Sequence, residues 1–135
     1  MTFSDVTPNL IVTDIDRSTA FYRDVLGFSV VAHVPDAPPF VFVWLQRGGV
    51  NVFLNVPEAA AHDLPEVALR PIGGTCGLFI LLEAPTTGEG VDALFATVSG
   101  RARVLMQPKD QFYGMREFAV EDPDGYFLTF AQRIG

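Results

Sequence analysis

Two glycines that stand 73 positions apart, Gly27 and Gly100, each follow a short amphipathic segment in this chain. The apolar residues of these segments recur at helical spacing: Ala20, Phe21, Val25 and Leu26 in the first, and Val91, Leu94, Phe95 and Val98 in the second. Apolar strand candidates precede the helices at residues 8–12 and 77–82, and two or three more follow each helix. The pattern therefore predicts an internal repeat of about half the chain.

Capping residues mark the ends of the predicted helices. Asp14 or Asp16 can accept hydrogen bonds at the start of the first helix, and Gly27 is suited to the left-handed conformation that ends it. The second helix is predicted at about residues 89–99. Residues 57–74 lack strand alternation and are predicted to connect the two halves, with a short helical turn at a run of three alanines.

Length and composition predict one compact domain. A chain of 135 residues is long enough for a single core and too short for two ordinary domains. We therefore expect one domain over residues 1–135, made of modules at about residues 5–57 and 75–133. A hydrophobic content of 49% with 19% charged residues argues against disorder.

Charge and hydropathy narrow the choice of partners and location. Nine basic against 16 acidic residues give a net charge of −7, which repels nucleic acid and anionic lipid. The same field favours a cationic small molecule, although an acidic surface is also an ordinary route to solubility. No apolar run approaches the length of a membrane span, and the N-terminus lacks a signal peptide pattern. With Cys76 as the only cysteine, we expect a cytoplasmic protein without internal disulfides.

The dipeptide Gly48-Gly49 predicts a two-residue hairpin turn, which fixes the side chains that face each other. The predicted pairs are Arg47 with Val50, Leu45 with Val52, Trp44 with Phe53, Val43 with Leu54, and Phe42 with Asn55. One face of this hairpin is aliphatic: Val41, Val43, Leu45, Val52, Leu54 and Val56. The other, the aromatic–amide face, consists of Phe40, Phe42, Trp44, Gln46, Asn51, Phe53 and Asn55.

The aromatic–amide face suits a binding cleft, because rings supply affinity and a few amides orient a ligand. A subunit interface is the alternative, since interfaces also combine rings with scattered hydrogen-bonding groups. A slip of one residue in the hairpin register would exchange the two faces.

Two motifs resemble a known family. Residues 113–126 read Tyr-Gly-Met-Arg-Glu-Phe-Ala-Val-Glu-Asp-Pro-Asp-Gly-Tyr, and residues 14–27 read Asp-Ile-Asp-Arg-Ser-Thr-Ala-Phe-Tyr-Arg-Asp-Val-Leu-Gly. Together they resemble the vicinal oxygen chelate superfamily of glyoxalases, bleomycin resistance proteins and extradiol dioxygenases. The resemblance implies an α+β fold of two βαβββ modules, which form a curved mixed β-sheet cleft with helices on its outer face.

Metal-using members of this superfamily carry ligands at positions that can be counted from the motifs. In this chain the count falls on Thr7, on Phe53 or Asn55, on Gly77 and on Thr129. None of these residues offers an imidazole or carboxylate donor, so the resemblance implies a site without a metal or other cofactor. The chain also departs from the drug-binding relatives at Tyr113, where they often carry tryptophan.

The remaining candidates for chemistry are few. His33 and His62 are interpreted as ordinary histidines and Cys76 as a buried, inert thiol. Residues 122–125, Asp-Pro-Asp-Gly, predict a structural turn. Arg116 and Glu117 can either face a ligand or form a salt bridge to that turn, and the salt bridge is the preferred interpretation.

The resemblance implies a metal-free, non-catalytic homodimer that binds a small aromatic or cationic molecule and sequesters an antibiotic. Three alternatives stay open: a metal-dependent lyase or dioxygenase, a metal-free isomerase or hydrolase, and a subunit whose cleft is only an interface. No catalytic residue is predicted. The expected ligand-binding residues are Phe42, Trp44, Phe53, Asn55, Phe79, Tyr113, Met115 and Thr129.

Overall fold

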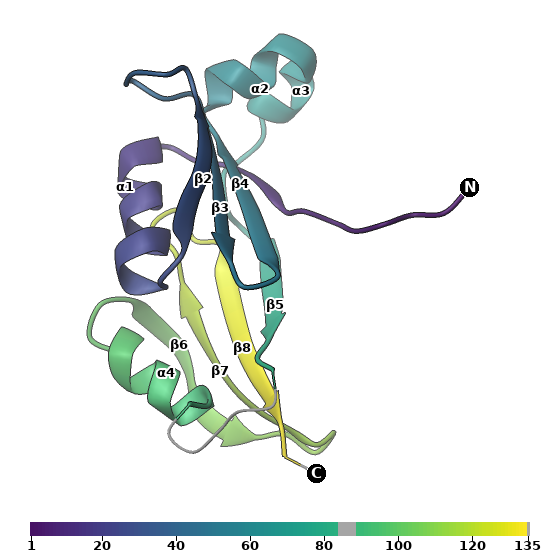
Figure 1. Cartoon of the computed structure of the whole chain (residues 1–135), viewed down its shortest axis with the longest axis vertical. Helices are drawn as coiled ribbons and strands as arrows, with labels where there is room; N and C mark the ends of the chain where they lie inside the picture. The colour runs from purple at the N-terminus through teal and green to yellow at the C-terminus, as the bar shows by residue number, and fades with distance from the viewer. Residues whose placement is uncertain (84–88, 135) are drawn as a thin grey trace. The chain divides into compact units, whose positions relative to one another are not determined.

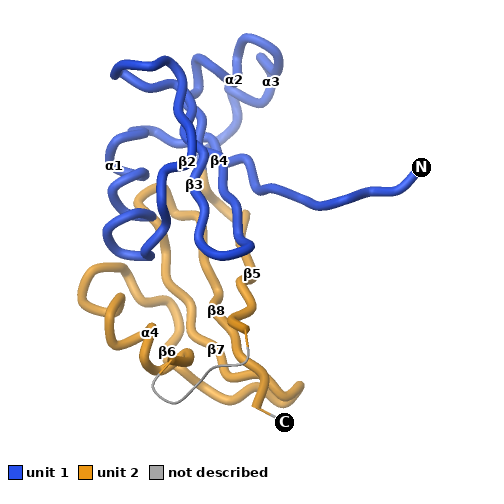
Figure 2. Tube along the Cα trace, viewed as in Figure 1, with its two compact units in different colours: residues 1–72 blue, residues 73–135 orange. Residues whose placement is uncertain are grey.

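A computed structural model describes residues 1–83 and 89–134. It divides into two compact units, residues 1–72 and 73–135, each built around one four-stranded mixed sheet (Figure 2). The predicted α+β class with two βαβββ modules is confirmed by the order of the elements. None of the helices in the described part of the chain is long and apolar enough to cross a membrane.

The first unit contains the elements β1 (Asn9–Ile11), α1 (Ile15–Ala20), the π-helical turn η1 (Phe21–Val25), β2 (Ser29–Val34), β3 (Phe42–Arg47), β4 (Val50–Asn55), α2 (Pro57–Asp63) and α3 (Pro65–Ala68). Its sheet has the order β1-β4-β3-β2, in which β1 and β4 are parallel and the other pairs antiparallel. Helices α2 and α3 both lie within the predicted connection at residues 57–74. This connection is thus more helical than the single turn expected from its alanines.

The predicted caps of the first helix are present. The Asp14 side chain accepts a hydrogen bond from the Arg17 backbone N–H at 3.0 Å, which satisfies a free donor of the first turn. Gly27 has a φ of 73°, in the left-handed region where glycine is favoured. Helix α1 packs on β3 and β4, and so covers the aliphatic face of the hairpin (Figure 1).

The hairpin register predicted from Gly48-Gly49 is confirmed in every pair, from Phe42 opposite Asn55 to Arg47 opposite Val50. Gly48 has a φ of 55°, as the first position of a type II′ turn requires. The buried core of this sheet contains Val43, Leu45, Val52 and Leu54, each at most 1% exposed. The expectation for Val41 was wrong: it precedes β3 and is 37% exposed.

The second unit contains β5 (Gly77–Leu81), α4 (Val91–Val98), β6 (Arg103–Asp110), β7 (Met115–Glu121) and β8 (Phe127–Arg133). Its sheet has the order β5-β8-β7-β6, with β5 parallel to β8, and so repeats the connectivity of the first sheet. Helix α4 packs on β6, β7 and β8 and is shorter than the predicted 89–99. Phe95 on α4 meets Phe118, and Phe118 stacks on Phe130 at 5.1 Å between ring centroids.

Candidate ligand-binding faces

Three rings form a continuous row on the aromatic–amide face of the first sheet. Phe53 on β4 lies between Phe42 and Trp44 of β3, at centroid distances of 5.2 Å and 5.8 Å. Both contacts are edge-to-face, the arrangement that the quadrupoles of aromatic rings favour. All three side chains are only partly buried, whereas their strand neighbours Val43 and Leu54 are fully buried. The alternation therefore leaves ring surface available on this face.

Amide groups lie beside these rings. Asn51 Oδ1 accepts two hydrogen bonds of 2.9 Å, one from Trp44 Nε1 and one from Gln46 Nε2. Asn55 Nδ2 donates to the side-chain oxygen of Asn9 on β1. The amides thus hold the indole of Trp44 in one orientation and still have free hydrogen-bonding positions, since each amide has more than one donor or acceptor site.

Asn9 was not among the predicted site residues. It is opposite Phe53 in the parallel β1–β4 register, and a parallel pairing cannot be derived from a hairpin turn. The signal that could have found it is its amide, which precedes two apolar residues in the first strand.

In the second sheet, the predicted residues Phe79 and Thr129 are opposite each other on β5 and β8. Phe79 is 58% exposed, and Ala119 of β7 is the neighbour of Thr129 on the other side. The structure therefore brings together four predicted residues on the first sheet and two on the second. That both groups bind the same ligand remains a prediction.

The last two predicted residues, Tyr113 and Met115, lie at the turn between β6 and β7 and next to Glu117. The Tyr113 hydroxyl donates to Glu117 Oε2 at 2.8 Å, and Gln111 Nε2 donates to Oε1 at 3.4 Å. This bond to the carboxylate raises the pKa of the Tyr113 phenol, because loss of the proton would remove the hydrogen bond and place two anions side by side. Met115 is two residues from Glu117 on the same face of β7.

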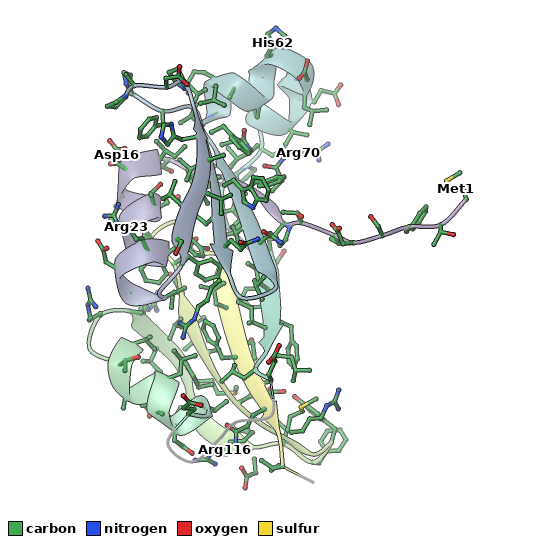
Figure 3. The ribbon with its side chains drawn as sticks, in the orientation of Figure 1. Met1, Asp16, Arg23, His62, Arg70 and Arg116 are labelled. Carbon is green, nitrogen blue, oxygen red and sulfur yellow. The ribbon has the colours of Figure 1, made fainter. Side chains whose placement is uncertain are left out.

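Arg116 and Glu117 do not form a salt bridge to the turn at residues 122–125, so that preferred interpretation was wrong. Glu117 is 3% exposed and bound as described above, while Arg116, its neighbour on β7, lies on the opposite face by strand alternation. The Arg116 guanidinium, whose position Figure 3 labels, pairs with Asp92 of α4 and with Asp110 of β6, both at 2.9 Å, and these pairs raise its pKa. The burial of Glu117 was not predicted. The sequence did contain an indication of it, because Glu117 alternates with Met115 and Ala119 along the predicted strand.

The predicted turn at residues 122–125 is structural. Asp122 Oδ1 accepts from the backbone N–H groups of Asp124 and Tyr126, at 2.8 Å and 3.0 Å. These bonds make an Asx-type turn, in which Gly125 has a φ of 89°. The Asp122 side chain therefore stabilises the turn between β7 and β8.

The remaining polar candidates lie apart from the rings. His33 Nδ1 is 2.9 Å from the Pro35 carbonyl oxygen, and the His33 ring lies against Phe40. His62 lies on α2, exposed, with Asp63 as its neighbour at 3.0 Å (Figure 3). Cys76 is exposed, which corrects the expectation of a buried thiol.

The positions counted as metal ligands hold other groups. Within residues 1–83 and 89–134, no set of three or more His, Cys, Asp or Glu side chains could hold a metal ion. At Gly77 a side chain would require the ring of Phe127 to move, because a Cβ there would lie 2.0 Å from that ring. Metal independence itself stays a prediction.

The repeated βαβββ connectivity and the two mixed sheets define the class of fold. A family model described as the Glyoxalase/Bleomycin resistance protein/Dioxygenase superfamily matches residues 5–130. The chain therefore belongs to this superfamily, as its end motifs predicted. It is 31% identical over 134 residues to a bleomycin resistance protein of Geobacillus stearothermophilus, a match that covers 94% of this chain and 95% of that protein.

Solved structures share this fold. TioX from Micromonospora sp. ML1 is similar with a TM-score of 0.73 and 22% identity, over 98% of this chain and all of the other. A lactoylglutathione lyase from Agrobacterium tumefaciens gives a TM-score of 0.72 at 19% identity, over 98% of this chain and 95% of that enzyme. At these identities the likeness establishes the fold, and proteins with different activities share it.

Proposed function

We propose that this protein binds a small planar aromatic molecule, preferentially a cationic one, and that binding keeps the compound from its target. The row formed by Phe42, Phe53 and Trp44 is the observation that carries the proposal. These partly exposed rings form edge-to-face contacts with one another, so their faces are available to a planar ligand. The similarity to bleomycin resistance proteins supports a role in antibiotic sequestration.

The chemistry around the rings fits such a ligand. Asn51 and Asn55 are held by Trp44, Gln46 and Asn9, so their orientation is fixed before a ligand arrives. Preorganised polar groups beside an apolar surface provide orientation at a small entropic cost. The net charge of −7 raises the local concentration of a cation over that of a neutral or anionic compound.

We further propose that the chain acts as one domain, as a homodimer and in the cytoplasm, and that Phe79, Tyr113, Met115 and Thr129 contribute to the same function. The exposed ring of Phe79 supports a role in contact with a ligand or a second subunit.

Fluorescence titration tests the proposed function. Trp44 is the only tryptophan of the chain, so its emission reports on the aromatic–amide face without a label. Bleomycin and a panel of planar aromatic cations should quench or shift this emission and raise the melting temperature, because they bind only the folded state. Compounds that raise the melting temperature without changing the emission would place the binding site elsewhere. Failure of the whole panel to bind would contradict the proposal.

A further inference from the structure

Glu117 carries a carboxylate that is buried in the second sheet, and among the described residues its hydrogen-bond donors are all neutral. It lies in the middle of β7 and is 3% exposed. Its oxygens accept from the Tyr113 hydroxyl at 2.8 Å and from Gln111 Nε2 at 3.4 Å. These bonds satisfy the oxygen atoms but leave a negative charge without a positive partner.

Basic residues near Glu117 do not supply that partner. Lys109 is opposite it in the β6–β7 register, and Arg133 is two residues from its β8 neighbour Ala131. Both are exposed, and neither forms an ion pair with Glu117 in the part of the chain that the structure describes. Residues 84–88 and 135, which lie outside that part, include no Lys, Arg or His. A buried carboxylate without a cation is costly, so a cation brought by a ligand would be favoured here.

The groups that cover Glu117 come from the short turn between β6 and β7. Tyr113, which donates to the carboxylate, is itself 52% exposed, and its neighbour Phe112 is 99% exposed. The carboxylate thus lies directly beneath a surface side chain. Met106, whose sulfur is 3.8 Å from Gln111 Nε2, adds a flexible and polarisable neighbour that adapts to ligands of different shape.

We propose that Glu117, on the second sheet, recognises the cationic group of a small aromatic ligand, an amidinium, a guanidinium or a primary ammonium. An N–H group of the ligand donates to the carboxylate in place of, or beside, the Tyr113 hydroxyl, and so forms the ion pair that Glu117 lacks in the described part of the free protein. This role deepens the proposed function and rests on it, because it assumes a small aromatic ligand. It also assigns selectivity for cations to one residue rather than to the overall acidity of the surface.

Two matched compounds test this role, 2-naphthamidine and its neutral isostere 2-naphthamide. The wild-type protein should bind the amidine about tenfold more tightly than the amide in calorimetric titrations at neutral pH. Glu117→Gln keeps the size and an acceptor oxygen but removes the charge, so it should abolish the preference. Glu121→Gln is the control. Glu121 lies on β7 like Glu117, but it forms an exposed ion pair with Arg103 of β6, and the substitution removes the same charge. It should keep the preference.

The outcomes separate the two proposals. A folded Glu117→Gln protein that keeps the preference, or a wild-type protein without one, overturns the role of Glu117. If both compounds bind equally and Trp44→Ala weakens both, the proposed function stands and the role of Glu117 fails. If neither binds, both fail. Should Glu117→Gln not fold, the carboxyl carbon of Glu117 in the wild-type protein must shift in NMR spectra with saturating amidine and not with amide. An unchanged signal overturns the role.

Discussion

The Arg47 guanidinium donates through Nη1 to the carbonyl oxygen of Leu26 at 2.6 Å, so a side chain from the end of β3 caps the first helix. The last carbonyl groups of a helix have no partner within it and carry the negative end of its dipole. Gly27 leaves room for this contact, because a Cβ there would lie 3.0 Å from Nη1. One arginine therefore joins the hairpin to the helix that covers its aliphatic face.

Replacing Arg47 with alanine should lower the free energy of unfolding by about 1.5 kcal/mol, the lower end of the usual range for a hydrogen bond that involves a charged group, because Arg47 is exposed. Denaturant unfolding measures this change. Arg23→Ala is the control, because Arg23 pairs with Asp24 while both side chains are about half exposed, at 51% and 49%. Its effect should be clearly smaller than that of Arg47→Ala, because an exposed ion pair contributes little to stability. Equal effects of the two substitutions would contradict the capping role.

The sequence predicts the structure well where a turn type fixes the strand register, and poorly where no turn type does. The two-residue turn at Gly48-Gly49 allows a single register, which is why all pairs of the first hairpin could be derived. No such rule covers the turn that contains Tyr113. Strand β6 has register shifts between Val104 and Met106 and again before Lys109. Such irregularities change which β6 residues lie opposite β7, so the pairing of Lys109 with Glu117 could not be counted from the sequence.

The metal positions show a similar limit. Counting along the motifs identified Gly77 as a position without a metal-binding donor. It did not explain why glycine stands at this position. The ring of Phe127, from the neighbouring parallel strand, occupies the space of a side chain at residue 77. A tertiary contact of this kind cannot be read from spacing alone. The internal repeat could be predicted because helix caps and strand alternation are local, and the resemblance of the end motifs implied the fold.

Metal independence is a direct prediction for the purified protein. With threonine, asparagine, phenylalanine and glycine at the counted ligand positions, a divalent ion would have no strong donor set. Elemental analysis should find no stoichiometric Zn, Ni, Fe or Mn, and a chelator should leave the melting temperature unchanged. One tightly bound ion per chain would instead favour a metal-dependent enzyme.

Dimerisation is expected because several large apolar side chains lie at the surface of the chain. The exposed fractions of Phe3, Val6, Phe79 and Phe112 are 90%, 91%, 58% and 99%. Apolar side chains exposed to this degree are typical of interaction sites. Light scattering at micromolar concentration should give twice the chain mass of 14.7 kDa. A monomer under these conditions would contradict the expectation.

Stability should fall at alkaline pH through two tyrosines. The bond to Glu117 raises the pKa of Tyr113, and burial raises the pKa of Tyr126. The unfolded chain then loses these protons first, near the ordinary tyrosine pKa of about 10. The stabilisation from both groups is complete below that pH and decreases as the pH rises through the folded-state values. Thermal melts of Tyr113→Phe should show a smaller alkaline decrease than the wild type, and an identical decrease would exclude a contribution from Tyr113.

Trp44→Ala should separate binding from folding. The ring of Trp44 contacts Phe53 edge-to-face and is partly exposed, so its loss removes ligand contact more than core packing. Aromatic contacts contribute about 0.5 to 1.5 kcal/mol beyond burial, so ligand affinity should fall about tenfold once buried area is included. Val43→Ala is the matched change on the opposite face. Val43 is 1% exposed, and this substitution should cost about 1 to 3 kcal/mol of stability while leaving affinity intact. Calorimetric titration with a bound aromatic cation, alongside denaturant unfolding, measures both. If Trp44→Ala binds normally, the ligand does not contact the aromatic–amide face.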